Sequence, residues 1–192
     1  MTRLLLIRHA ESEWNAVGRW QGLADPVLSE RGRAEARAAA AILSGVVGRV
    51  VCSDLQRAAE TADIISEVLG LGPVERLGEL REIDVGEWSG LTRSDIEERW
   101  PGGIERWFRG EDVGNGAEDR AAFRERVVAA ITSLAGEDRG PTLVVTHGGA
   151  ISAVEIHLDV HPGVPFPRLA GRWFDFDGSL RVASDRFALD SD

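Results

Sequence analysis

The alternation of short apolar runs with longer helical patterns constrains the fold of this chain more than any other feature. Three apolar runs bounded by polar residues have the pattern of strands buried on both faces: residues 4–7, 49–52 and 142–146. Apolar residues that recur at steps of three and four predict helices over residues 29–44, 55–69, 117–135 and 148–158. Such alternation favours an α/β fold of three layers, with a mostly parallel sheet flanked by helices.

Local signals place the ends of some elements. Ser53 is expected to cap the helix that begins near residue 55, because Gln56 follows it at the spacing of a capping box. Residues 74–77 are expected to add a short edge strand. Near the C-terminus, the alternating pattern of residues 173–186 around Asp177-Gly178 predicts a β-hairpin.

Length and composition favour one globular domain. A chain of 192 residues is close to the length of an average domain, roughly 150 residues, so residues 1–192 are expected to form a single domain. No apolar segment approaches the roughly 18 residues of a membrane span. The single cysteine, Cys52, cannot form an intrachain disulfide, which fits a reducing compartment. We therefore expect a cytoplasmic protein.

The charge of the chain narrows its partners and its chemistry. A net charge of −10 argues against nucleic acid and anionic membranes as partners, and it means that an anionic substrate needs a local cationic pocket. All 22 basic residues are arginines, and the chain has neither lysine nor tyrosine. These absences exclude the phosphate lysine of Walker-type sites, Schiff-base chemistry and tyrosine acid catalysis.

Polar residues follow each of the three predicted core strands. Arg8-His9 ends the first, Ser53 ends the second with Arg57 one turn into the next helix, and His147-Gly148 ends the third. If the strands run parallel, their carboxyl ends lie at one edge of the sheet, where ligands of open α/β sheets collect. Two arginines, two histidines and a glycine-rich helix start suit a phosphoryl group.

Each of these residues alone also has a purely structural explanation. A histidine after a strand is often a hydrogen-bonded loop residue, an exposed arginine is usually solvated, and Glu82 could form a surface ion pair with Arg81. The joint occurrence favours the anion site. Because hydrolysis of phosphate monoesters needs an acceleration of up to about 10²¹-fold, a nucleophile, a cationic clamp and an acid are all expected.

Four ordered blocks then match one family. Arg8-His9-Ala10-Glu11 resembles the Arg-His-Gly-Glu signature of the histidine phosphatase superfamily, in its metal-independent branch around phosphoglycerate mutase. The similarity covers residues 3 to about 158 and leaves out the C-terminal hairpin. The remaining matches are Trp14-Asn15, Gly18-Arg19, Gln21-Gly22, Asp25, Leu28-Ser29 and Gly32; Ser53-Asp54-Leu55, Arg57-Ala58 and Thr61-Ala62; Arg81-Glu82, Gly86, Trp88 and Gly90; and Thr146-His147-Gly148-Gly149.

The resemblance implies roles for individual residues. His9 is the implied nucleophile, which forms a phosphohistidine, and Glu82 the implied general acid and base. The implied contacts of the phosphoryl group are Arg8, Asn15, Arg57, His147 and the Gly148 amide. The resemblance implies no metal ion and no other cofactor. His157 and His161, with Glu155 nearby, give only a weak metal signal, because the helix is expected to end at Leu158.

The chain also departs from the family pattern. Ala10 replaces the usual glycine, which is costly if the turn needs a positive φ. Residues 115–119 replace a Pro-Gly-Gly-Glu-Ser segment at the expected floor of the substrate pocket. The expected lid, about residues 91–116, is short and lacks the tyrosine, lysine and paired arginines with which mutases hold a bisphosphate. We expect hydrolysis rather than transfer for this reason.

The substrate beyond its phosphate is the least constrained part of the prediction. Gln21, Gly22, Arg106 and Trp107 are expected to contact it, although the aromatic residues could instead pack the lid onto the sheet. We predict a phosphatase of small phosphomonoesters such as sugar phosphates, phosphoglycerate-like acids or nucleotide-precursor phosphates. The alternatives are a phosphoglycerate mutase and a phosphoprotein-directed or non-catalytic regulatory module. A small-molecule phosphate ester is the expected partner, and a homodimer is left open.

Overall fold

The computed structural model describes residues 1–161 and 163–189; residues 162 and 190–192, which the expected domain includes, lie outside them. A seven-stranded sheet has the order β3-β2-β4-β1-β5-β6, and β7 also pairs with β5. Its first four strands in the chain run parallel: β1 (Thr2–Arg8), β2 (Arg49–Ser53), β3 (Glu75–Leu77) and β4 (Thr142–Thr146). The last three strands are β5 (Ala170–Phe176), β6 (Leu180–Val182) and β7 (Phe187–Ala188). Strand β5 pairs antiparallel with β1, and β6 and β7 each pair antiparallel with β5.

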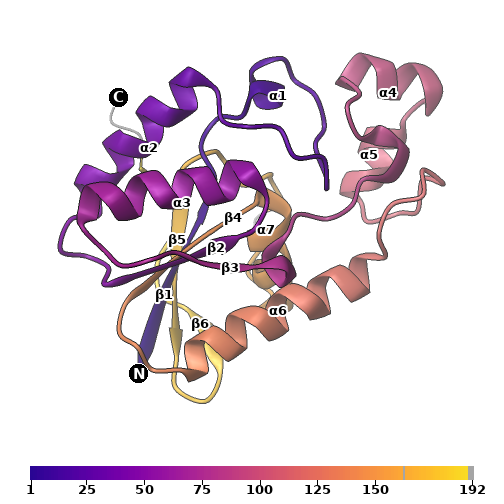
Figure 1. Cartoon of the computed structure of the whole chain (residues 1–192). Helices are drawn as coiled ribbons and strands as arrows, with labels where there is room; N and C mark the ends of the chain where they lie inside the picture. The colour runs from indigo at the N-terminus through magenta and orange to yellow at the C-terminus, as the bar shows by residue number, and fades with distance from the viewer. Residues whose placement is uncertain (162, 190–192) are drawn as a thin grey trace.

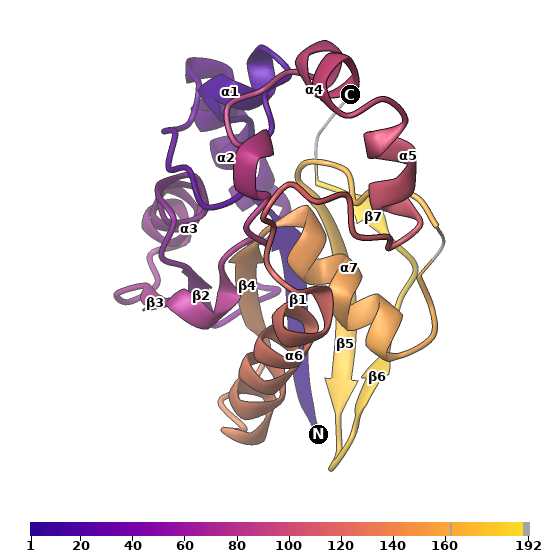
Figure 2. The ribbon, with the colours of Figure 1, turned by 90° about the vertical axis from the view of Figure 1, so that its right-hand side faces the viewer.

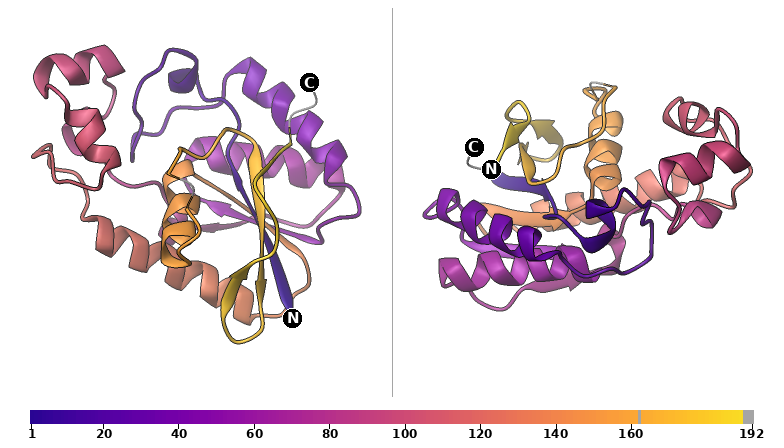
Figure 3. Two further views of the ribbon diagram at one scale, coloured as in Figure 1. Left: turned by 180° about the vertical axis from the view of Figure 1, so that it is seen from behind. Right: turned by 90° about the horizontal axis from the view of Figure 1, so that it is seen from above.

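Helices cover both faces of this sheet (Figures 1 and 3). The helices of the described residues are α1 (Glu13–Ala16), α2 (Glu30–Ile42), α3 (Gln56–Leu69), α4 (Arg93–Arg99), α5 (Gly103–Phe108), α6 (Arg120–Gly136) and α7 (Gly148–His157), with single turns at Gly78–Leu80 and Gly86–Trp88. Because successive side chains of a strand point to opposite faces, Leu5 and Ile7 pack with α2 and α3, whereas Leu4 and Leu6 pack with α6 and α7. The predicted three-layer α/β fold is confirmed.

The carboxyl ends of three parallel strands meet at one edge of the sheet. Arg8 of β1 lies opposite Thr146 of β4, and Cys52 of β2 lies opposite Val145 of the same strand. In Figure 2 β1 runs upward from the N-terminus, and α4 and α5 of the expected lid lie beyond its upper end. The residues that follow these strands are therefore brought together, as the sequence predicts.

The C-terminal hairpin and the edge strand are also confirmed. Strands β5 and β6 pair around Asp177-Gly178, and β3 adds an edge strand beside β2. Strand β5 begins earlier than predicted, at Ala170, and it pairs along most of β1. None of the helices in the described ranges is long and apolar enough to cross a membrane.

Two element ends differ from the prediction. Ser53 does not cap α3: it is the last residue of β2, and the cap position is Leu55, which makes no side-chain cap bond. The Ser53 hydroxyl is instead 2.9 Å from Nε2 of His147, a contact across the sheet that no local rule detects. Helix α6 begins at Arg120 rather than 117, because the Asp119 carboxylate caps it by accepting from the Ala122 amide.

Candidate active site

Two buried imidazoles lie side by side at this edge of the sheet. The ring centroids of His9 and His147 are 5.3 Å apart, with the rings edge to face. The His9 amide donates to the Thr146 carbonyl at 2.9 Å, so β4 fixes the backbone of residue 9. The residues after β1 and β4 thus form one cluster, although the chain separates them by most of its length.

A hydrogen bond fixes the tautomer of His9. Its Nδ1 lies 2.7 Å from the carbonyl oxygen of Ala10. A carbonyl oxygen can only accept, so Nδ1 carries the proton and Nε2 keeps its lone pair. His9 also lines a large cavity of about 910 Å³. The ring therefore has a lone pair on Nε2, as the predicted nucleophile requires.

Both imidazoles are neutral at neutral pH. Burial, followed by the positive charge of Arg57, holds the pKa of His9 well below its ordinary value, and the same two causes act on the pKa of His147. A neutral His9 has the lone pair that attack on phosphorus needs. The arginines that lower the pKa are also the cations expected around a bound phosphate.

The free energy of unfolding should therefore decrease as the pH falls below about 6.5, the ordinary pKa of histidine. The unfolded chain protonates near that pH, whereas folded His9 and His147 stay neutral to a lower pH. Each histidine then removes about 1.4 kcal/mol of stability per pH unit. Urea unfolding between about pH 5 and pH 8 measures this slope. His9→Asn should reduce it, and an unchanged slope would contradict the assignment.

Two arginines extend into the same region with part of their hydrogen-bonding capacity used. Arg8 Nη1 donates to the Phe166 carbonyl at 2.8 Å, and Arg57 donates to the carbonyls of Ala24 and Gly22 at 2.7 and 2.8 Å. Burial lowers the pKa of Arg57 to about 10, which leaves Arg57 charged at neutral pH, and burial also lowers the pKa of Arg8. The backbone bonds hold each guanidinium in place.

Unpartnered buried nitrogens mark where an anion fits. Within the described chain, four buried side-chain nitrogens have no hydrogen-bond partner, and three belong to this cluster: Arg8 Nε, Arg57 Nε and His147 Nδ1. Leaving buried donors unpaired is costly. The oxygens of a phosphoryl group are strong acceptors of charge-assisted hydrogen bonds and suit the two arginine nitrogens. His147 Nδ1 is a donor in the tautomer whose Nε2 accepts from the Ser53 hydroxyl.

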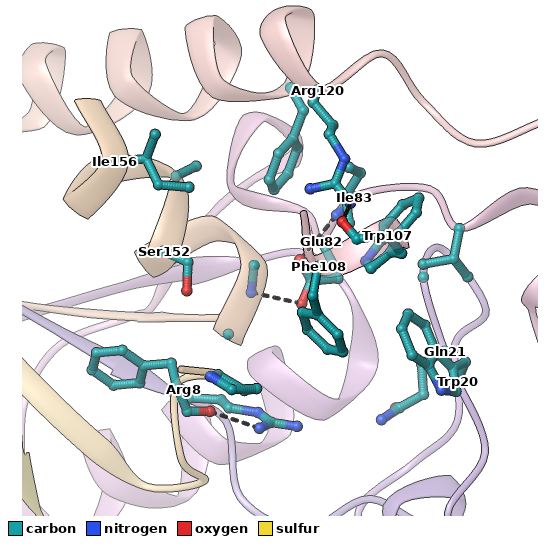
Figure 4. A pocket seen from close by; sticks show the side chains of 18 of the residues that line it. Arg8, Trp20, Gln21, Glu82, Ile83, Trp107, Phe108, Arg120, Ser152 and Ile156 are labelled. Carbon is teal, nitrogen blue, oxygen red and sulfur yellow. Dashed lines mark hydrogen bonds between the residues drawn. The ribbon is translucent and has the colours of Figure 1, made fainter. Parts of the chain in front are cut away.

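Glu82 points into the cavity and is held by two amides (Figure 4). Its Oε2 accepts from the Gly149 amide at 3.1 Å and its Oε1 from the Ile83 amide at 3.0 Å. Any side chain at position 149 would displace this carboxylate, since a Cβ there would lie 2.2 Å from Oε1. The predicted acid therefore stands beside the helix start that carries Gly148, and its ion-pair alternative fails because Arg81 binds Asp54 instead.

The loop after β1 supplies the remaining predicted residues. Asn15 lines the cavity, and its carbonyl oxygen accepts from the Ser12 amide, which leaves the amide nitrogen as a donor. Gln21 is buried, and its oxygen accepts from the Ser12 hydroxyl. Gly22 has a φ of +51°, and a Cβ there would lie 2.9 Å from the Val85 nitrogen. Only glycine fits this turn without strain.

Of the two lid residues that were predicted to contact the substrate, one lines the cavity and the other does not. Trp107 lines the cavity, whereas Arg106 does not and lies half-buried elsewhere on α5. Consecutive residues of a helix point about 100° apart, so burying the indole turns the guanidinium away. Trp20 and Phe108 line the cavity together with Trp107, and the Trp20 ring packs against both of the other rings.

The departures from the family pattern have simple structural consequences. Ala10 is fully buried, and its φ is not positive, so a methyl group is tolerated there. Asn115 is buried and donates to the Val85 carbonyl, while Glu118 forms an ion pair with Arg126. Cys52 is also fully buried, and burial raises the pKa of its thiol to about 12, so the residue contributes to packing within the sheet.

A chain of contacts from the C-terminal strands supports Arg8. Glu155 of α7 is fully buried and binds Arg186, with Nε and Oε1 2.8 Å apart. Arg186 lies over the Phe166 ring and donates to the Val164 carbonyl at 3.1 Å. The Phe166 carbonyl in turn accepts from Arg8. Sequence reasoning missed this support, because no local pattern relates residue 186 to residue 8. The buried carboxylate of Glu155 is thus paired with Arg186, and it also forms an ion pair with Arg172.

The fold and the site together define an α/β enzyme with a cationic site centred on a neutral histidine. The profile of the histidine phosphatase superfamily (branch 1) matches residues 4–170. Glucosyl-3-phosphoglycerate phosphatase of Mycolicibacterium vanbaalenii is 34% identical over 200 residues, which cover 95% of this chain and 87% of that protein. Phosphoserine phosphatase 1 of Hydrogenobacter thermophilus is 37% identical over 148 residues, which cover 76% of this chain and 70% of that protein.

A solved structure agrees with the sequence relatives. A mycobacterial glucosyl-3-phosphoglycerate phosphatase in complex with VO3 matches with a TM-score of 0.85 and 30% identity, over 95% of this chain and 98% of that chain. Phosphoglycerate mutases that depend on 2,3-bisphosphoglycerate are relatives at similar identity. The chain belongs to the histidine phosphatase superfamily, in its phosphoglycerate mutase-like branch, and is a phosphoric monoester hydrolase.

Proposed function

We propose that this protein hydrolyses small phosphomonoesters without a metal ion, through a phosphohistidine on His9 and with Glu82 as general acid and base. The observation that carries the proposal is the bond from His9 Nδ1 to the Ala10 carbonyl, which directs the lone pair to Nε2. The unpartnered nitrogens of Arg8, Arg57 and His147 support it, since they would bind the phosphoryl oxygens where charge accumulates.

The reaction divides into two displacements on phosphorus. In the first, His9 Nε2 attacks, the bond from phosphorus to the ester oxygen breaks, and protonated Glu82 gives its proton to the leaving oxygen. In the second, water attacks the phosphohistidine, Glu82 takes a proton from that water, and the bond to Nε2 breaks. Inorganic phosphate leaves, His9 regains its lone pair, and Glu82 is again protonated. Asn15 and the Gly148 amide supply neutral donors to the phosphoryl oxygens.

Trapping the intermediate tests this mechanism. Quenching the enzyme within its first turnovers on ³²P-labelled substrate, in excess chelator, should give a labelled protein whose phosphate is lost in acid and retained in base. The rate should not change with chelator, because every step uses side chains alone. An acid-stable adduct, or a rate that collapses in chelator and returns with added metal, would rule out the mechanism.

Phosphoryl transfer is the second candidate, because phosphoglycerate mutases are among the relatives. A mutase delivers the phosphoryl group to a phosphorylated acid, whereas a phosphatase delivers it to water. The lid of this chain contains no lysine or tyrosine to hold a second phosphate. Inorganic phosphate as the product in the presence of 3-phosphoglycerate identifies the phosphatase; a bisphosphate identifies the mutase.

A further inference from the structure

The cavity is much larger than a phosphoryl group requires. Its volume is about 910 Å³, near the upper end of the roughly 300–1,000 Å³ found for sites that take whole drug-sized ligands. Arg8 and His9 lie at one end of it. The rest of the cavity is space for the part of the substrate that is not transferred, and the residues there determine which ester binds.

Arg120 lines this cavity away from Arg8. In Figure 4 the two arginines stand at opposite ends of the view, with Glu82 between them. The Arg120 guanidinium lies over the Trp107 ring, with its carbon 4.0 Å from the ring centroid, and donates to the Trp107 carbonyl. These contacts orient a planar cation toward the cavity and leave most of its donors unused.

No acidic side chain of the described residues forms an ion pair with Arg120. Arg109, which also lines the cavity, is neutralised by Glu105 and Glu111. The carboxylate of the neighbouring Asp119 accepts from the Ala122 amide instead. Arg120 is half-buried, and a partly buried charge without a partner is unfavourable unless a ligand compensates it.

Arg124 adds a second cation on the same face of α6. It lies one helical turn after Arg120, also lines the cavity, and likewise forms no ion pair within the described residues. The first turn of a long helix itself favours negative charge. Two arginines without an ion pair in the described part of the chain therefore line this cavity, although the net charge is −10, and the carboxylate of Asp119, which precedes Arg120 in the sequence, caps α6.

We propose that Arg120, assisted by Arg124, binds a second anionic group of the substrate, a carboxylate or a phosphate, at the end remote from the ester that is cleaved. This rests on the proposed phosphatase function and names its substrate class. The walls near these ends are largely apolar: Ile83, Val85, Trp107, Phe123, Ala153 and Ile156. The substrate is thus an extended phosphomonoester in which a carbon skeleton or ring separates the two anions.

A matched series of esters tests this without any variant. The compounds are phenyl phosphates that carry at the para position a carboxyalkyl chain of one, two or three methylene groups, each paired with its neutral carboxamide. Charged hydrogen bonds to a guanidinium should raise kcat/KM for the best acid roughly 10- to 100-fold above that of its amide. A compound with a phosphonate in place of the carboxylate shows which anion the site prefers: a higher kcat/KM for the phosphonate indicates a phosphate site, and a higher kcat/KM for the acid indicates a carboxylate site.

Variants then assign the effect to a residue. Arg120→Gln should remove most of the preference for the acid, through KM, while kcat for p-nitrophenyl phosphate, which has no second anion, stays within about threefold. Arg106→Gln, a half-buried arginine of the adjoining helix outside the cavity, is the matched control and should keep the preference. Thermal unfolding of each variant shows whether it is folded.

The outcomes separate this inference from the proposed function. Hydrolysis of p-nitrophenyl phosphate with equal kcat/KM for every acid and amide pair overturns the second-anion site and leaves the phosphatase intact. A preference that survives in Arg120→Gln and in Arg124→Gln also overturns it. A wild-type protein that hydrolyses none of the esters overturns the proposed function instead.

Discussion

His9→Ala should lower kcat on p-nitrophenyl phosphate by roughly 10⁴- to 10⁶-fold, the scale of loss seen when a covalent nucleophile is removed. Cys52 and Ser53 at the end of β2 cannot replace its Nε2, because both side chains are fully buried and neither lines the cavity. The phosphoenzyme should be absent as well. Steady-state kinetics and acid quenching measure the two effects.

Two further variants make the His9 result interpretable. In His9→Asn the side-chain amide can still donate to the Ala10 carbonyl from the position of Nδ1, so this variant keeps the local structure and removes only the nucleophile. His157→Ala alters an exposed histidine at the end of α7 and should keep kcat within about twofold. Substantial turnover or a phosphoenzyme in His9→Asn would refute the assignment.

Glu82→Gln should lower turnover of alkyl phosphates by roughly 10²- to 10⁴-fold, the usual contribution of a positioned acid. An alkoxide must be protonated as it leaves, whereas p-nitrophenolate is stable without a proton. With p-nitrophenyl phosphate the variant should therefore release one equivalent of nitrophenol in a burst and then accumulate phosphoenzyme, because no base activates the water. Stopped-flow absorbance measures the burst.

Gly149→Ala tests the same role by steric means. A Cβ at this position would lie 2.2 Å from Glu82 Oε1, so the carboxylate must move although its chemistry is unchanged. We expect the same burst and the same loss on alkyl phosphates. Gly136→Ala, at the end of α6 where a Cβ meets nothing within 4 Å, is the matched control. The same burst and the same loss of alkyl phosphate turnover in both glycine variants would show a general effect of the substitution.

The parts of the site that the sequence predicts depend on short patterns joined by one topological rule. His9, Arg57 and His147 each follow a recognisable strand, and parallel pairing brings strand ends together. The same reasoning predicts the layers and the hairpin. Where a local pattern competes with a distant contact, it fails: Ser53 has capping-box spacing, but its hydroxyl contacts His147 and the cap is lost.

The remaining part of the site is set by contacts that no local pattern encodes. Arg120 occupies the first turn of α6 like any solvated arginine, and only packing against Trp107 shows that it faces the cavity. To predict that Trp107 lines the cavity and Arg106 does not, one must know which face of α5 is buried. The helix that carries the two residues is short, so the periodicity that would reveal its buried face is weak.

The chain of contacts from Glu155 to Arg8 has a consequence for how the family can diverge. The match to the family profile ends at residue 170, so Arg186 lies outside the matched residues. Arg186 nevertheless contacts the segment around Phe166, whose carbonyl holds Arg8, one of the proposed phosphate-binding residues. A change in the C-terminal strands that displaces Arg186 would therefore remove a support of the segment that holds Arg8, although no residue of the shared signature is altered.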